Sequence, residues 1–243
     1  MCNRYSRDAD IHAVWERFHA DRIFDHGVNS IPYLQKPEFN IAPQNFALTV
    51  FAPDDRRAIN SMIFGLAPAW CYGKKITNRF TNARAETLTD KLASKDLLPA
   101  KRCLIPATGF YEWKKEDGRK QPYHFRLKGG GLFAFAGLWD TWRSSDPTAS
   151  ESYSFAIVTT KPNELCATVH DRMPVILDEE AEKRWLDPNE HEPAKLLPLL
   201  KPFPAEQMES YRVTPQMSYS SFNDRRCVEP WDGKTGQLQL LSR

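Results

Sequence analysis

The sequence predicts an antiparallel, β-rich α+β fold. Strand-like segments follow one another in the middle of the chain, and short turns rather than helical crossovers join them, which is typical of antiparallel sheets. The chain has 243 residues, of which 41% are hydrophobic, and this suits one large domain or two small ones. Because no repeat, low-complexity stretch or linker divides the sequence, we expect a single folded unit.

The N-terminal part predicts helices and strands in alternation. Apolar residues at helical spacing indicate a helix within residues 8–25, with Asp8 or Asp10 as its cap. Alternating or continuous apolar residues predict strands at 47–51 and 62–66, and a short helix is expected over 86–94.

The central part predicts the main sheet, and the last third is more helical. The strands are expected at 102–105, 109–114, 123–127, 132–138, 153–159 and, near the end, 210–213. A hairpin turn is expected at 128–131 (KGGG) between two of them. Helices are expected at 162–169, where Pro162 suits a first helical turn, and at 178–186 and 193–200. From Asn223 onward the chain is polar, which predicts a docked or frayed tail.

Composition excludes several classes of protein. The aromatic fraction of 12% is too high for a disordered chain, and the longest apolar runs are far shorter than the ~20 residues that span a bilayer. The first residues lack the apolar core of a secretory signal, so a cytoplasmic protein is expected. The net charge of +2 argues against a protein that coats DNA generally.

Positive charge is nevertheless concentrated in residues 74–103, where eight basic residues stand against three acidic ones. The basic residues are Lys74, Lys75, Arg79, Arg84, Lys91, Lys95, Lys101 and Arg102. Such a patch suits phosphates, and the alternative is a solvated helix face with pairs of opposite charge.

The five cysteines, at positions 2, 71, 103, 166 and 227, form no Cys-x-x-Cys pair and are odd in number. We therefore expect reduced thiols, no metal and no cofactor. Cys2 is the unusual one, because removal of Met1 would leave a 1,2-aminothiol at the chain end. Its amine would condense with an aldehyde and its sulfur would close a thiazolidine ring, whereas the alternative is a second-position cysteine without a role.

Four further side chains are candidates for a site. Asn82 and Arg84 would face the same side of an extended segment. Glu112, among aromatic residues, would lose solvation and have a raised pKa, unless it points to solvent from an edge strand. His170, after a helix end, is suited to moving protons at neutral pH, unless it only bonds to Asp171 or to the backbone.

Trp70 is a further candidate, for stacking on a base, with a core position as the alternative. The other four cysteines are expected to pack as small apolar groups.

Taken together, several segments resemble the SOS response-associated peptidase (SRAP) family of abasic-site processing proteins. They occur in the family's order over roughly residues 1–225. The segments are 1–4 (MCNR), 39–43 (FNIAP), 64–70 (FGLAPAW), 82–87 (NARAET), 102–113 (RCLIPATGFYEW), 136–139 (AGLW), 159–163 (TTKPN) and 170–177 (HDRMPVIL).

The resemblance implies a single α+β domain with a twisted, barrel-like antiparallel core and helices at its flanks, over 1–225, with a polar tail over 226–243. It implies a monomer that captures abasic sites in single-stranded DNA covalently during the DNA-damage response, after self-removal of Met1, with lyase-like chemistry and a place at the nucleoid. The residues that match catalytic positions are Cys2, Asn82, Glu112 and His170. The residues that match DNA contacts are Arg4, Pro43, Trp70, Arg84 and Arg172.

Two positions depart from the family pattern. Asn3 stands where glycine is usual after the cysteine, and Thr108 stands where aspartate is common. Glycine permits close backbone approach, so Asn3 could alter the groove, although asparagine tolerates unusual backbone angles better than most residues.

Two alternatives stay open. One is a cysteine hydrolase that acts on other peptides or amides, with Cys2, His170 and either Asn82 or Glu112 as nucleophile, base and orienting group. The other is a module that binds single-stranded nucleic acid without a covalent bond.

Overall fold

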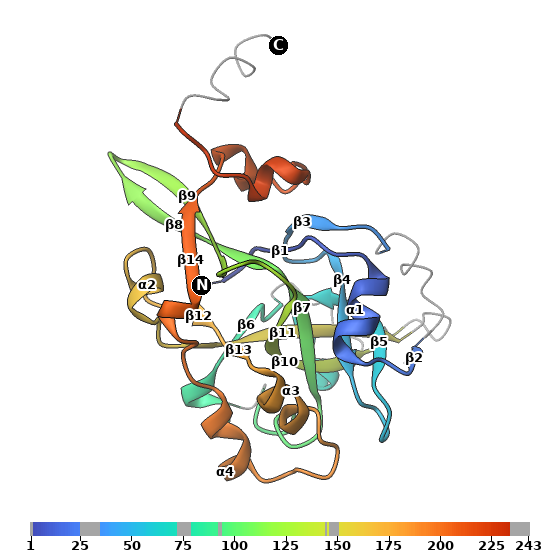
Figure 1. Cartoon of the computed structure of the whole chain (residues 1–243). Helices are drawn as coiled ribbons and strands as arrows, with labels where there is room; N and C mark the ends of the chain where they lie inside the picture. Colours follow the sequence, from blue (N-terminus) through green and yellow to red (C-terminus); the bar gives the residue numbers. More distant parts are fainter. Residues whose placement is uncertain are drawn as a thin grey trace.

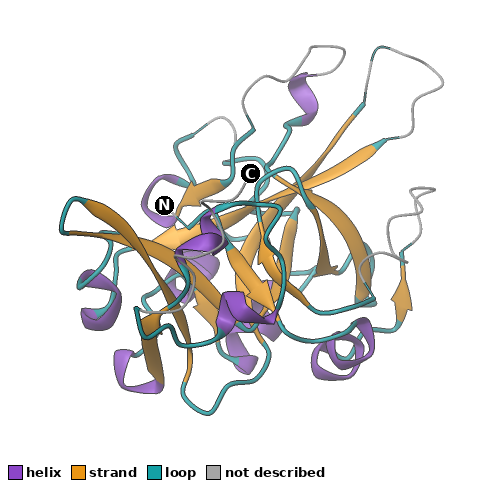
Figure 2. Cartoon of the chain, turned by 90° about the horizontal axis from the view of Figure 1, so that it is seen from above, coloured by secondary structure: helices purple, strands orange, loops and turns teal. Residues whose placement is uncertain are grey.

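The computed structural model describes residues 2–24, 35–71, 79–91, 94–143, 145 and 151–233. Its strands form a closed barrel and a second, five-stranded sheet that lies against it, while short helices flank them (Figures 1 and 2). Within the described residues, no helix is long and apolar enough to cross a membrane.

Five strands close the barrel, in the order β11, β10, β7, β4 and β5. Their bounds are β4 (Phe46–Phe51), β5 (Ala58–Phe64), β7 (Arg102–Ala107), β10 (Phe133–Trp142) and β11 (Ser152–Thr160). Neighbours along this order are antiparallel, as the sequence predicts, but β5 closes the ring on β11 through a parallel pair. The barrel is therefore mixed rather than purely antiparallel.

Short strands extend the barrel at its margins. These are β2 (Arg22–Ile23) on β5, β6 (Asn82–Arg84) and β12 (Met173–Pro174) on β11, and β13 (Ile176–Leu177) on β10. The segment around Asn82 is thus fixed to the barrel wall by backbone pairing with β11.

The second sheet is antiparallel and has the order β14, β9, β8, β1 and β3. Its strands are β1 (Tyr5–Arg7), β3 (Glu38–Ile41), β8 (Gly109–Glu116), β9 (Arg119–Leu127) and β14 (Met208–Arg212). The N-terminal strand β1 is therefore an interior strand, paired on one side with β3 and on the other with β8.

Turn chemistry explains one hairpin and corrects another. Asp117 and Gly118, both with positive φ, join β8 to β9, and an Asp-Gly pair is the usual signal for such a two-residue turn. The predicted hairpin at 128–131 is wrong, because β9 and β10 on either side of it belong to different sheets. The glycine run there turns the chain from one sheet to the other.

The α-helices in the described part of the chain are short. They are α1 (Ile11–Phe18), α2 (Glu164–Ala167), α3 (Glu179–Trp185) and α4 (Pro193–Leu196). Asp10 caps α1 by accepting from the Ala13 amide, as predicted, but the helix ends at His19 with positive φ, well before residue 25. The helix predicted over 86–94 is wrong within the described residues: a 3₁₀ turn occupies Ala85–Thr87, and the residues from 94 onward form turns.

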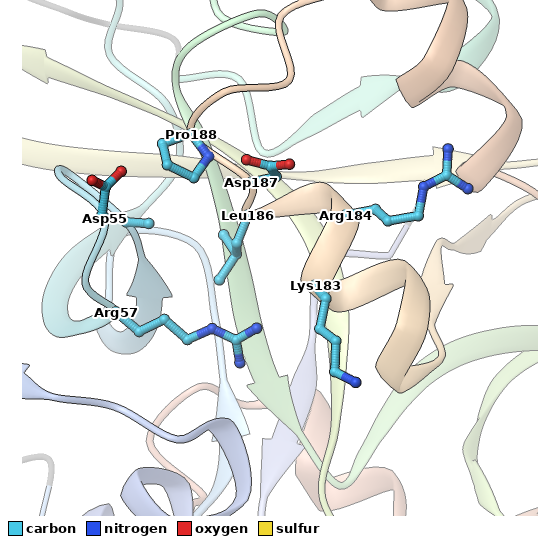
Figure 3. A pocket seen from close by; sticks show the side chains of 8 residues that line it. Asp55, Arg57, Lys183, Arg184, Leu186, Asp187 and Pro188 are labelled. Atoms are coloured by element: carbon cyan, nitrogen blue, oxygen red, sulfur yellow. The ribbon is translucent and has the colours of Figure 1, made fainter.

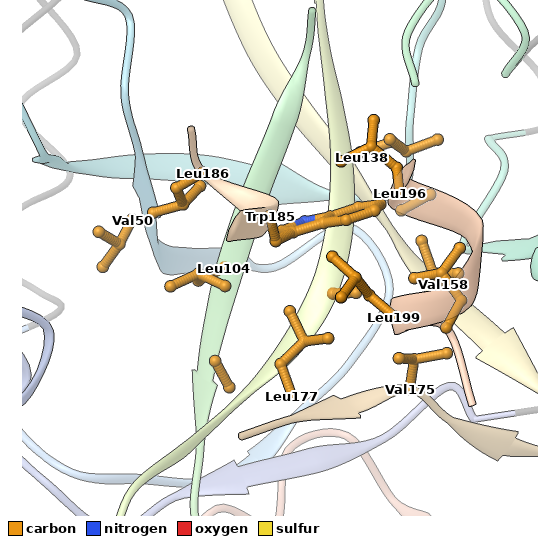
Figure 4. Packing of buried hydrophobic residues seen from close by; sticks show 14 of the residues in the cluster. Val50, Leu104, Leu138, Val158, Val175, Leu177, Trp185, Leu186, Leu196 and Leu199 are labelled. Atoms are coloured by element: carbon orange, nitrogen blue, oxygen red, sulfur yellow. The ribbon is translucent and has the colours of Figure 1, made fainter. Parts of the chain in front are cut away.

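Apolar side chains fill two large clusters. One, rich in aromatic residues, includes Tyr5, Phe64, Phe135 and Phe155. The other lies between the barrel and helices α1, α3 and α4, and Figure 4 shows Trp185 among its leucine side chains. The Trp185 indole also donates to the Cys103 carbonyl at 3.0 Å, so a buried polar group of β7 is satisfied from the helix.

The segment after β14 docks on the second sheet rather than fraying, as far as it is described. The Asn40 amide of β3 lies within 3.0 Å of the carbonyl oxygens of Met217, Tyr219 and Phe222. Cys227 is fully buried beneath this segment. The boundary between a domain at 1–225 and a tail at 226–243 stays a prediction, since residues 234–243 lie outside the described part of the chain.

Candidate active site

Cys2 lies at the start of the segment that forms β1, and its side chain is fully buried. Burial and, second, the nearby Glu112 carboxylate raise the pKa of the Cys2 thiol well above its ordinary value. The nucleophile candidate is thus neutral near pH 7 and belongs to the aromatic cluster of the barrel. This environment favours a thiol that reacts after another group has bound the substrate.

Glu112 occupies the middle of β8, between β1 and β9, and only 3% of it is exposed. The alternative of an edge strand facing solvent is therefore wrong. Burial, assisted by the Asp171 charge, raises the pKa of Glu112 to about 7, in the direction that the sequence predicts. A carboxyl group with this pKa holds or releases a proton readily at neutral pH.

His170 reaches the same place from the loop between α2 and β12. Its Nε2 lies 3.8 Å from Oε2 of Glu112, while its Nδ1 accepts from the Arg172 amide at 3.1 Å. The neutral ring therefore carries its hydrogen on Nε2, facing Glu112. Nδ1 also lies 2.9 Å from the Asp171 carboxylate, which would pair with the protonated ring. Partial burial lowers the pKa of His170, which favours the neutral form.

Asn82 is connected to the Cys2 segment by a hydrogen bond to Asn3, which the sequence did not predict. Its Nδ2 donates to Oδ1 of Asn3 at 2.7 Å and to Oγ1 of Thr81 at 3.0 Å. Thr81 in turn donates to Asn3 Oδ1 at 2.9 Å. Asn3 thus links the Cys2 segment to β6. In the sequence Asn3 was noted only as a departure from the family pattern, although its position next to Cys2 could have indicated a place in the site.

The Arg172 side chain binds to the turn that follows β6. Its guanidinium forms a bidentate pair with Glu86 at 2.8 and 2.9 Å and donates to the Thr159 carbonyl at 2.7 Å. The pair joins the His170 loop to the segment that carries Asn82. A DNA contact by Arg172 stays a prediction.

The other predicted DNA contacts differ in exposure. Trp70 is 54% exposed, so the alternative of a core tryptophan is wrong. Arg84 is exposed and Pro43 is half-buried. Arg4 donates to Asn40 Oδ1 and to the carbonyls of Met217 and Ser218, so its guanidinium anchors the docked C-terminal segment.

A pocket of about 330 Å³ opens beside Asn82 and Arg84. Its lining combines an apolar part with a polar and basic part. The residues are Leu66, Phe80, Asn82, Ala83, Arg84, Thr87, Lys91, Ser94, Leu138 and Ala156. Cationic and apolar lining together are what an unpaired nucleotide needs.

The basic stretch at 74–103 contributes less to the surface than its charge count suggests. Lys101 pairs with Asp140 at 2.5 Å, and Arg102 is buried, with its guanidinium on backbone carbonyls. Lys74 and Lys75 lie outside the described residues. Arg84 and Lys91 are the members that line the pocket beside Asn82.

Three of the other cysteines, at positions 103, 166 and 227, are buried as predicted, whereas Cys71 is partly exposed. None of the five is in a disulfide.

A second pocket, of about 280 Å³, is separate from this group of residues. Figure 3 shows Arg57 facing Lys183 of α3 across it, with Asp55 and Asp187 nearby. None of its lining residues belongs to the candidate site, and its mixture of both charges favours no single ligand.

Comparison with known proteins places this geometry in context. The family model described as SOS response associated peptidase (SRAP) matches residues 1–220. The abasic site processing protein YoqW of Bacillus subtilis is 38% identical over 230 residues, covering 94% of this chain and 99% of the relative. The abasic site processing protein HMCES of Xenopus tropicalis is 30% identical over 224 residues, covering 79% of this chain and 66% of the relative. A crystal structure of a Bacteroides thetaiotaomicron protein has a TM-score of 0.80 at 26% identity, covering 95% of this chain and 100% of that one.

Proposed function

Because the chain belongs to the SOS response-associated peptidase (SRAP) family, we propose that it captures abasic sites in single-stranded DNA as a covalent adduct at Cys2. Homologues named as abasic site processing proteins support processing of these lesions in general. The observation that supports the proposal is that Glu112 lies 3.8 Å from His170 and near enough to Cys2 to raise the pKa of its thiol, while Asn82 is hydrogen-bonded to the residue that follows Cys2. On this proposal the adduct shields the lesion during the DNA-damage response, in the cytoplasm at the nucleoid.

The first step frees the Cys2 amine. Hydrolysis of the Met1–Cys2 peptide bond adds a hydroxyl to the Met1 carbonyl carbon and a hydrogen to the Cys2 nitrogen. We assign this step to the chain itself, with Glu112 as the group that moves the proton, because its pKa of about 7 suits both taking and giving.

The second step opens the sugar. An abasic deoxyribose is mainly a closed hemiacetal, and Glu112 takes the C1′ hydroxyl proton and passes it to the ring oxygen, while the Nε2–H of neutral His170 forms a hydrogen bond to the sugar. The 3.8 Å between Nε2 and the Glu112 carboxylate supports the assignment of both groups to one sugar. The product is the C1′ aldehyde.

The third step forms the crosslink. The Cys2 amine attacks C1′, water leaves and an iminium forms. The Cys2 sulfur then adds to the same carbon, the electron pair of the C=N bond moves onto nitrogen, and the released thiol proton replaces the proton that was used to expel water, so a thiazolidine and one water are the products. A thiol with a raised pKa stays protonated until this point, which keeps it from reacting with other carbonyls first.

DNA is held around this centre by phosphate contacts and stacking. Arg84 and Lys91 line the pocket beside Asn82 and suit the flanking phosphates. The exposed Trp70 ring suits stacking on a neighbouring base, while Arg4, Pro43 and Arg172 complete the proposed contacts. Such contacts read no base edges, so little sequence preference is expected.

The decisive experiment uses labelled single-stranded DNA with one abasic site and a denaturing gel. The wild-type protein should give a stable adduct and Cys2→Ala none, with Cys166→Ser as the matched control for loss of a buried cysteine. Cys2→Ser keeps the amine but lacks the sulfur, so it should give an adduct only after borohydride reduction of the imine. The proposal is overturned if the wild type forms no adduct or if Cys2→Ala forms as much.

The hydrolase alternative has less support. A cysteine hydrolase needs a thiolate next to a basic histidine, whereas burial raises the pKa of Cys2 and His170 faces Glu112 and Asp171. Turnover of peptide substrates without DNA, blocked by thiol alkylation, would favour that alternative. Salt-sensitive binding without a denaturation-resistant adduct would favour the non-covalent module.

A further inference from the structure

Three side chains beside the chain end form a closed triangle of hydrogen bonds. Asn3 Oδ1 accepts from Asn82 Nδ2 at 2.7 Å and from Thr81 Oγ1 at 2.9 Å, and Thr81 Oγ1 accepts from Asn82 Nδ2 at 3.0 Å. Asn3 is bonded covalently to Cys2, so the triangle connects the nucleophile segment directly with β6. A glycine at position 3 would make neither of the two bonds to Asn3 Oδ1.

Counting hydrogens fixes how the Asn82 amide is oriented. Its two N–H groups are both used, one on Asn3 and one on Thr81, and the Thr81 hydroxyl hydrogen goes to Asn3. The remaining polar atom is Asn82 Oδ1. It is buried, and no described residue donates to it. A buried acceptor without a donor costs stability, so this atom needs a partner that arrives later.

We infer that Asn3 is a positioning residue that turns the Asn82 amide so that Oδ1 accepts from the nitrogen of Cys2 during crosslinking. This inference rests on the proposed function. Removal of Met1 gives the Cys2 nitrogen additional hydrogens, and attack on the aldehyde then makes it a cationic iminium N–H. A carbonyl oxygen held in a buried place stabilises such a cation through a charge-assisted bond.

The inference separates the two asparagines by role. Asn82 touches the reacting nitrogen, whereas Asn3 acts only through Asn82. Loss of Asn3 should therefore slow the chemical step without weakening DNA binding, because an Asn82 amide held only by the 3.0 Å bond to Thr81 is less firmly oriented. Loss of Thr81 Oγ1 alone should have a smaller effect, because the 2.7 Å bond between Asn3 and Asn82 remains.

The test compares Asn3→Leu, which has a similar shape without an acceptor, with Asn3→Asp, which can only accept. Rate constants for crosslinking are measured at saturating abasic single-stranded DNA and at the plateau of each pH–rate profile. Intact mass confirms that Met1 is absent from each variant. Affinity is measured with DNA that carries a tetrahydrofuran in place of the sugar, which cannot open to an aldehyde.

Asn3→Leu should crosslink roughly tenfold more slowly at unchanged affinity, Asn3→Asp should restore most of the rate, and Thr81→Val should lie between them. In an Asn82→Ala background, Asn3→Leu should have no further effect. The inference is overturned if Asn3→Leu matches the wild type, if Asn3→Asp is as slow as Asn3→Leu, or if the slowing persists without Asn82. Absence of any wild-type adduct would instead overturn the proposed function.

Discussion

The imidazole Nε2 of His170 lies 3.8 Å from the carboxylate Oε2 of Glu112, and the two side chains come from different layers of the molecule. Glu112 belongs to β8 of the five-stranded sheet, and His170 to the loop that leads into β12 on the barrel. This separation is longer than a hydrogen bond but lies within the range of an ion pair when the imidazole is protonated. The candidate site therefore lies where the five-stranded sheet meets the barrel, and both contribute side chains to it.

Glu112→Gln should change how stability depends on pH. Between about 4.5 and about 7 the folded protein takes up a proton at Glu112 that the unfolded chain does not, so wild-type stability falls as pH rises through this range. The variant should lack this loss and be more stable than the wild type by ~3 kcal/mol at pH 8. Urea unfolding at pH 4.5 and 8 measures the difference, with the exposed Glu164→Gln as control. A stability gain of equal size at both pH values would contradict the explanation.

His124 should make the protein sensitive to acid. The buried His124 ring has its Nε2 3.0 Å from Ser6 Oγ and its Nδ1 3.0 Å from the Tyr211 hydroxyl, whose hydrogen is used on the Val228 carbonyl. Burial lowers its pKa to about 3. The unfolded chain binds the proton below about 6.5, so stability should fall as pH drops, by up to roughly 1.4 kcal/mol per pH unit.

His124→Gln should reduce the decrease in unfolding free energy at low pH, because an amide cannot take the proton. His12→Gln, at an exposed histidine, is the matched control and should leave the pH dependence of the unfolding free energy unchanged. Guanidinium unfolding from pH 4 to pH 7 measures the slope, and an unchanged slope in His124→Gln would show that other groups cause the loss.

Arg102→Lys should destabilise the protein without affecting DNA binding. The guanidinium donates to five backbone carbonyls at 2.6–2.8 Å, and a lysine cannot reproduce that fork. The unfolding free energy should fall by roughly 3 kcal/mol, because buried carbonyls lose their donors. Thermal unfolding and a DNA titration at low temperature give the two readouts. Weaker DNA binding at unchanged stability would instead indicate that Arg102 contacts DNA.

Trp70→Ala should weaken DNA binding and leave stability nearly unchanged. Stacking of a base on an aromatic ring contributes roughly 1–3 kcal/mol, so a loss of about fivefold or more in affinity is expected. Tyr219→Ala is a matched control, since Tyr219 is 60% exposed and lies in the docked C-terminal segment. Fluorescence anisotropy with single-stranded DNA measures both, and equal losses would argue against a specific role for Trp70.

The strands could be predicted from the sequence because their apolar pattern is local. The central strands, their order along the chain and the α+β class are confirmed, and Asp10 caps α1 as expected. The parallel closure of β5 on β11 could not be predicted, because it depends on pairing between residues far apart in the chain. The hairpin predicted at 128–131 is wrong for the same reason: its glycines indicate a turn but not which sheet each neighbouring strand joins.

The burial of one candidate side chain could be predicted, whereas the hydrogen bonds around the candidate site could not. A carboxylate among aromatic residues indicates burial, and Glu112 is buried with a raised pKa. Charge counting, in contrast, cannot tell a surface arginine from Arg102, which enters the interior because backbone carbonyls receive it. The bond between Asn3 and Asn82 also escaped prediction, because it joins two segments that meet only through the completed sheet.

The interior position of β1 has a consequence for the order of events during synthesis. Tyr5 pairs with Phe110, so the first strand to leave the ribosome waits for β8, a delay of roughly 5 to 20 s at ordinary elongation rates. Throughout that interval Glu112 has not yet been made, so the Cys2 segment lacks its partner strand β8 and we expect it to be accessible to enzymes that trim nascent chains. Once β8 is in place, the thiol is enclosed beside Glu112. Trimming by another enzyme would therefore act on the growing chain, whereas the proposed self-removal of Met1 would require the finished fold.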